Sequence, residues 1–190
     1  MATTTPRVRD FTTAERLLHV EVASGDAFEM LLSLYALGGD EDEADLAIGS
    51  EWFEGIRSRA GEDLLARLRL FGDWSVWIAL ISEVHAMGAP YTSERLLEHL
   101  AQMDPVALRR GLLEVGSCHA SEPIPSDDLE AMAEGDLDVI SRAGAWCDKC
   151  PGLMELLKLP ADSTRDTLVG LLGSFWEADP VPAGTVGIME

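Results

Sequence analysis

The stretch DWSVWIALISEVHAM, residues 73–87, constrains the fold most. Drawn as a helix, it has Trp74, Trp77 and Ile81 on one side and Val76 and Leu80 on the other. A helix that is apolar nearly all round is usually enclosed by other elements. The stretch therefore predicts a central helix in a bundle.

Elsewhere the apolar residues recur at intervals of three and four, which is typical of amphipathic helices. Asp104-Pro105 is a strong start signal, because Asp accepts from free amides and Pro suits the first helical position. In the first half of the chain, besides the segment at 73–87, we expect one helix from the N-cap candidates Ser24–Asp26 to Gly38, a second that includes 52–56 and a third that includes 64–71. Another helix begins at Thr92 or Ser93, and the next runs from Pro105 to about Gly116. The remaining helices are expected near 127–134, 136–145 and 151–158, with the last one beginning at Ser163. These patterns predict an all-α, multi-helix bundle.

The N-terminal part leaves an alternative open. Leu18, Val20 and Val22 alternate with other residues, which fits a short strand, but the segment also fits a first helix entered at Thr13. We expect a flexible N-terminus at 1–12, a helical regulatory domain at 13–178, and a linker or truncated tail at 179–190.

The excess of acidic residues restricts the kinds of molecule that this chain can bind. The chain has 34 acidic and 14 basic residues, for a formal net charge of −20. Binding to nucleic acid draws its affinity from Lys and Arg that displace counterions from phosphates. The densest basic stretch, with Arg57, Arg59, Arg67 and Arg69, is interleaved with acidic residues. We therefore expect no direct nucleic-acid binding by this chain.

The start, MATTTPRVRDFTTAERLL, has polar residues where a signal peptide would need an apolar region. Charges interrupt the apolar stretches every few residues, so no segment predicts a membrane span. We expect a cytoplasmic protein with no membrane partner.

The cysteines give the alternative functional hypothesis. Cys147 and Cys150 form a C-x-x-C pair, and Cys118-His119 lies about thirty residues earlier, so the four could hold a metal ion. The pair also fits a redox dithiol, although no βαβ unit surrounds it. Ordinary thiols are the third interpretation, and our working expectation is that no cofactor is bound.

The aromatic residues suggest a ligand pocket between helices. Trp74, Trp77 and His85 belong to the central helix and are the candidate lining. Plain core packing is the alternative for the tryptophans, and a hydrogen-bonded core residue is the alternative for His85. We find no set of polar residues at catalytic spacing, so we expect a protein that is not an enzyme.

Four stretches carry a resemblance to a known family: LLHVEVASGDAFEMLLSLYALGG, EWFEGIRSRAGEDLLARLRLFG, MDPVALRRGLLEVG and DSTRDTLVGLLGSFWEADPV. In order, they span most of residues 17–181. Together they resemble the N-terminal helical region of bacterial ArsR-like winged-helix transcriptional regulators.

The resemblance implies a regulatory or dimerisation domain. In such regulators a winged helix follows the helical region and reads DNA, but this chain has no basic recognition helix before Glu190. The cysteine motif of the metal-sensing members is not recognisable either. The resemblance therefore implies a homodimer with a possible small-molecule effector, and a DNA-binding winged helix outside this chain.

Overall fold

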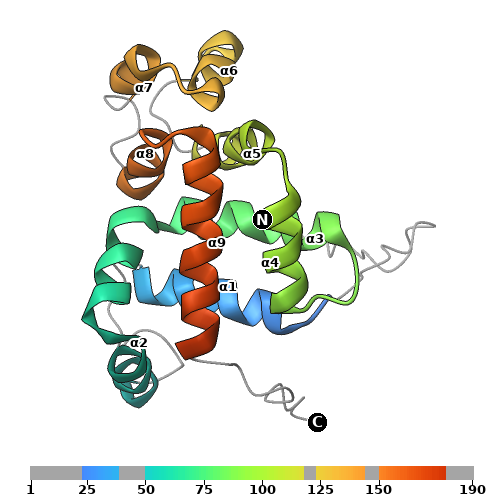
Figure 1. Ribbon diagram of the computed structural model, residues 1–190, viewed down its shortest axis with the longest axis vertical. Helices are drawn as coiled ribbons and strands as arrows, with labels where there is room; N and C mark the ends of the chain where they lie inside the picture. Colours follow the sequence, from blue (N-terminus) through green and yellow to red (C-terminus); the bar gives the residue numbers. More distant parts are fainter. Residues whose placement is uncertain (1–22, 39–49, 118–122, 144–149, 179–190) are drawn as a thin grey trace, which may run out of the picture.

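The computed structural model describes residues 23–38, 50–117, 123–143 and 150–178. Within these ranges the regular structure is entirely helical, as predicted (Figure 1). The helices are α1 (Asp26–Gly38), α2 (Ser50–Phe71), α3 (Trp74–Met87), α4 (Ser93–Gln102), α5 (Pro105–Ser117), α6 (Ser126–Glu134), α7 (Leu137–Ala143), α8 (Pro151–Leu157) and α9 (Ala161–Ala178).

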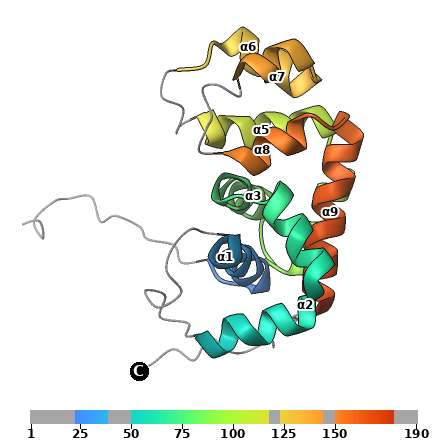
Figure 2. The same ribbon diagram turned by 90° about the vertical axis from the view of Figure 1, so that its left-hand side faces the viewer.

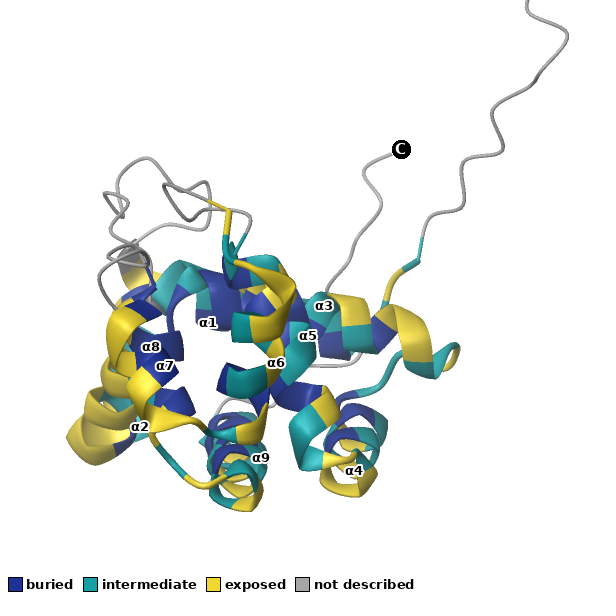
Figure 3. Cartoon of the chain, turned by 90° about the horizontal axis from the view of Figure 1, so that it is seen from above, coloured by how far each residue is buried: buried dark blue, intermediate teal, exposed yellow. Residues whose placement is uncertain are grey.

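The helices are stacked in layers (Figure 2). Helices α6 and α7 form one end, followed by α5 with α8, then α3, then α1, with part of α2 at the other end. Helix α9 runs along one side of the stack and contacts α2, α4, α5 and α8. Figure 3 shows buried residues turned towards the interior and exposed ones on the outer helix faces.

Helix α3 is central, as its sequence predicts. It packs against α1, α4, α5 and α8, and its buried residues include Val76, Trp77, Leu80 and Val84. Its remaining sides are not all covered, since Ile78 is 36% exposed.

Asp73 joins the start of α3 to the start of α8. Its Oδ1 accepts from the backbone N–H of Ser75 at 2.9 Å and of Val76 at 3.2 Å, which caps α3. Its Oδ2 accepts from the N–H of Leu153, in the first turn of α8, at 2.9 Å. Free amides at a helix N-terminus favour a carboxylate. One buried side chain therefore satisfies two helix ends.

Arg109 makes the corresponding connection at helix C-termini. This fully buried residue of α5 donates from Nη2 to the carbonyls of Met132, near the end of α6, and Leu157, at the end of α8, at 2.8 and 2.7 Å. Its Nη1 donates to the Leu159 carbonyl at 2.9 Å. A cation suits these carbonyls electrostatically, although burial lowers the pKa of Arg109. The Arg109 side chain thus holds α5, α6 and α8 together.

Helix α2 is kinked. Gly61 has φ 74° and ψ 162°, outside the helical region, and divides α2 into two halves. Glycine populates positive φ without the steric cost that a Cβ adds. The sequence predicts two helices here, and the structure places the break between them at Gly61.

Most of the predicted helix boundaries agree with the structure, but the predicted start of the last helix was wrong. Helix α9 begins at Ala161, two residues before the expected Ser163. The carbonyl of Pro160 accepts from the N–H of Thr164 at 2.9 Å and so begins the helix earlier. The possible strand at 18–22, the N-terminus 1–12 and the tail 179–190 lie outside the described residues.

Candidate functional site

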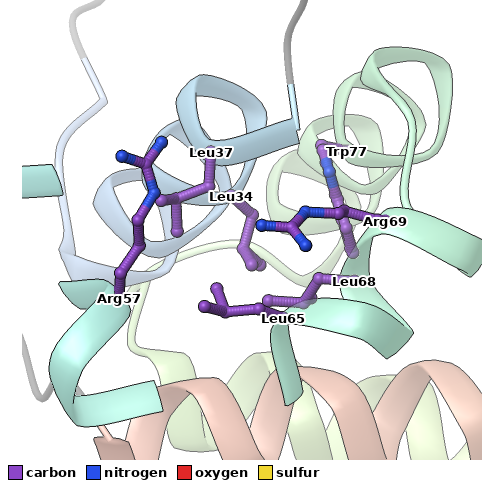
Figure 4. Close-up of a pocket in the computed structure, with 7 residues that line it drawn as sticks. All are labelled: Leu34, Leu37, Arg57, Leu65, Leu68, Arg69 and Trp77. Carbon is purple, nitrogen blue, oxygen red and sulfur yellow. The ribbon is translucent and has the colours of Figure 1, made fainter. Parts of the chain in front are cut away.

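A small pocket lies where α1, α2 and α3 meet. It has a volume of about 70 Å³. We call it the arginine pocket; it is lined by Leu34, Leu37, Arg57, Leu65, Leu68, Arg69 and Trp77 (Figure 4). Apolar side chains with a few polar groups are typical of small-molecule sites, although this pocket is smaller than most of them.

The kink in α2 positions the basic residues. Arg57 comes from the half before Gly61, and Arg69 comes from the half after it. Figure 4 shows the Arg69 side chain reaching over Leu65 and Leu68, with Arg57 on the other side of the pocket near Leu37. The two cations therefore border an otherwise apolar space.

The two arginines differ in their surroundings. Arg57 is half-buried, and its guanidinium carbon lies 5.6 Å from the ring centroid of Phe53, a cation–π distance. Arg69 is exposed and has no ion pair with any acidic residue in the described ranges. Arg69 is therefore the side chain better placed to bind an anion.

Trp77 supplies a third polar group. The residue is 1% exposed, and its Nε1–H has no acceptor among the described residues. A buried indole N–H usually has a hydrogen-bond partner, and leaving one without costs roughly 1–3 kcal/mol. Trp77 lines the pocket together with Arg69. The residue therefore carries an enclosed donor that no described residue satisfies.

The pocket continues into an open groove on the surface. The groove shares Arg57, Leu65 and Arg69 with the pocket and adds Ser58, Glu62 and Ala66. The shared arginines thus lie where the two spaces join. Glu62 adds a negative charge to the lining of the groove.

Of the predicted pocket residues Trp74, Trp77 and His85, only Trp77 lines the arginine pocket. Trp74 is half-buried. His85 is exposed near the end of α3, where its ring lies 5.1 Å from Phe28 and 6.3 Å from Tyr91, centroid to centroid. These positions separate His85 from the pocket that contains Trp77.

The proposed metal ligands fall mostly outside the described ranges. Cys118, His119 and Cys147 are not among the described residues. Cys150 is buried and occupies the N-cap position of α8 without making a side-chain cap. In the part of the chain that the structure describes, no three His, Cys, Asp or Glu residues are grouped as metal ligands.

Two other charged pairs lie on the described surface. His99 lies 3.2 Å from the Glu83 carboxylate. Arg110 donates to Glu130 at 2.5 Å, and this hydrogen bond raises the pKa of Arg110. Such pairs are ordinary surface contacts of small energetic effect.

Arg57 and Arg69 were not predicted as site residues from the sequence. The basic stretch that contains them was weighed only as a nucleic-acid footprint. The signal that could have identified them was the glycine between two short helical patterns, with one arginine on each side.

Within the described residues, no helix is both long and apolar enough to cross a bilayer.

Comparison with known protein families, with curated proteins and with solved structures finds no match to this chain.

Proposed function

We propose that this chain is the helical regulatory domain of a cytoplasmic transcription regulator, and that it senses a small molecule in the arginine pocket. The observation that carries the sensing function is the pocket itself, which combines an apolar lining, two arginines and the unsatisfied Trp77 N–H. The regulatory role rests on the resemblance to ArsR-like regulators. In this proposal the chain is not an enzyme, and a winged helix outside it binds the DNA.

The position of the pocket supports a regulatory role. A ligand there would contact α1, both halves of α2, and α3. A ligand that binds one arrangement of these helices more tightly shifts the population towards it. Couplings of this kind are typically about 1–3 kcal/mol, which is enough to alter the activity of an attached domain.

A homodimer belongs to the same proposal. Leu32, Leu70 and Leu137 are at least half exposed, at 52%, 50% and 57%, and offer apolar surface for association. Light scattering on a sizing column tests this part separately. A monomer at all accessible concentrations would remove dimerisation from the proposal and leave ligand sensing in place.

The sensing function can be tested by following the indole N–H resonances of the five tryptophans in proton–nitrogen NMR spectra. Trp77→Phe identifies the Trp77 signal, and Trp176→Phe serves as the assignment control. The protein is titrated with small anionic, neutral and cationic metabolites. We expect at least one compound to move the Trp77 signal and to raise the unfolding temperature. If no compound moves this signal, the pocket is not a sensing site.

A further inference from the structure

We infer that the arginine pocket selects a small organic monocarboxylate, with the carboxylate at Arg69 and a short apolar body over the leucines. This inference rests on the proposed sensing function and specifies the chemistry of its ligand. Four leucines, Leu34, Leu37, Leu65 and Leu68, form the apolar part of the lining. The positive charges lie at its border with the open groove.

Charge complementarity selects an anion. The whole chain has a net charge of −20, so two arginines on one small pocket are a local exception. A guanidinium matches the planar carboxylate with two parallel hydrogen bonds. Arg69 is exposed and has no ionic partner within the described part of the chain, so binding a carboxylate would break no ion pair seen there.

The surroundings favour one negative charge over several. Glu62 lines the groove that opens from the pocket, beside Arg57 and Arg69. A phosphate ester or a dicarboxylate would bring additional charge towards this carboxylate and be repelled. The leucines, in contrast, favour a ligand in which the charged group is attached to an apolar chain. A monocarboxylate with a short tail meets both conditions.

The indole of Trp77 would complete the site. Its Nε1–H is enclosed, so a ligand oxygen reaches it only after a neighbouring side chain moves. Arg69 lines the same pocket as Trp77, and as an exposed side chain it can rotate at little cost. In the inferred site, the Arg69 guanidinium holds the carboxylate while the side chains around the indole move to admit one of its oxygens. The carboxylate then accepts from the Arg69 guanidinium, and one of its oxygens also accepts from the Trp77 N–H.

The test uses hexanoate as the probe, with 1-hexanol as a neutral analogue of matched chain length and inorganic phosphate as a second anion. Each is titrated into the full chain while the Trp77 N–H resonance is followed. We expect hexanoate to move this resonance downfield and to bind more tightly than either comparison compound. In a series from acetate to octanoate, the affinity should rise with chain length until the tail fills the pocket.

Two arginine variants separate the roles of local and general charge. Arg69→Gln should weaken hexanoate binding about tenfold or more, because it removes the charged donor. Arg67→Gln, on the same half of α2 but outside the pocket lining, removes the same charge and should leave the affinity nearly unchanged. Circular dichroism confirms that both variants are folded.

The outcomes distinguish this inference from the proposed function. Equal binding of hexanol and hexanoate, or equal weakening by both variants, would overturn charge recognition at Arg69. Tighter binding of phosphate would overturn the carboxylate assignment. If none of these probes moves the Trp77 signal but another metabolite does, the inference fails and the sensing function stands. If no compound moves it, both fail.

Discussion

Asp73 provides the sharpest test of how the helices are held together. Its carboxylate caps α3 through Ser75 and Val76, and it also accepts from the N–H of Leu153 in α8. Removing an N-cap side chain costs about 1 kcal/mol. A hydrogen bond to a charged group contributes about 1.5–3 kcal/mol. Asp73→Ala should therefore lower the free energy of unfolding by roughly 2.5–4 kcal/mol.

Asp73→Asn separates the two contributions. Asparagine caps a helix about as well as aspartate, so the cap of α3 should survive. Its amide nitrogen carries two donors and cannot accept from the Leu153 N–H. We expect a loss of about 1.5–3 kcal/mol, which corresponds to the α8 contact alone.

Asp104→Ala is the matched control. Asp104 is exposed and its Oδ1 accepts from the Ala107 N–H at 2.9 Å, which caps α5 alone. This variant should lose about 1 kcal/mol. Urea unfolding followed by far-ultraviolet circular dichroism measures all three variants by linear extrapolation. Equal losses for Asp73→Ala and Asp104→Ala would refute the double-capping role.

Three further substitutions, with Gly170→Ala as a control, test other contacts by the same unfolding measurement. Arg109→Met leaves three carbonyl acceptors without their guanidinium donor and should cost about 3 kcal/mol or more; a loss below about 1 kcal/mol would show that other donors replace it. Gly72→Ala places a Cβ 2.1 Å from Cζ2 of Trp77 and should cost about 1–3 kcal/mol through overpacking, whereas Gly170→Ala in α9, where a Cβ meets nothing within 4 Å, should be neutral or stabilising. Gly61→Ala puts a side chain at φ 74° and should cost about 1–3 kcal/mol; an unchanged stability would mean that α2 can straighten without strain.

The helices could be predicted from the sequence because their signals are local. Asp104 and Thr92 act as N-caps where the sequence places them, and the apolar segment at 73–87 becomes the central helix. The contacts between helix ends could not be predicted in this way. Asp73 and Leu153 are 80 positions apart, and Arg109 reaches a carbonyl 50 positions away. Neither partner is marked by any periodicity in the sequence.

The candidate site also could not be predicted from the sequence. Arg57 and Arg69 are twelve positions apart, so in a straight helix they would be roughly 18 Å apart along the axis and about 120° apart around it. They line one pocket because the non-helical backbone at Gly61 turns the second half of α2 relative to the first. The linear sequence shows these arginines interleaved with acidic residues, so that residues 54–69 contain four arginines and three carboxylates and have little net charge. The kink at Gly61 instead places the two arginine cations beside an apolar space. A single glycine conformation therefore converts a mixed charge pattern into a pocket with the features of an anion site.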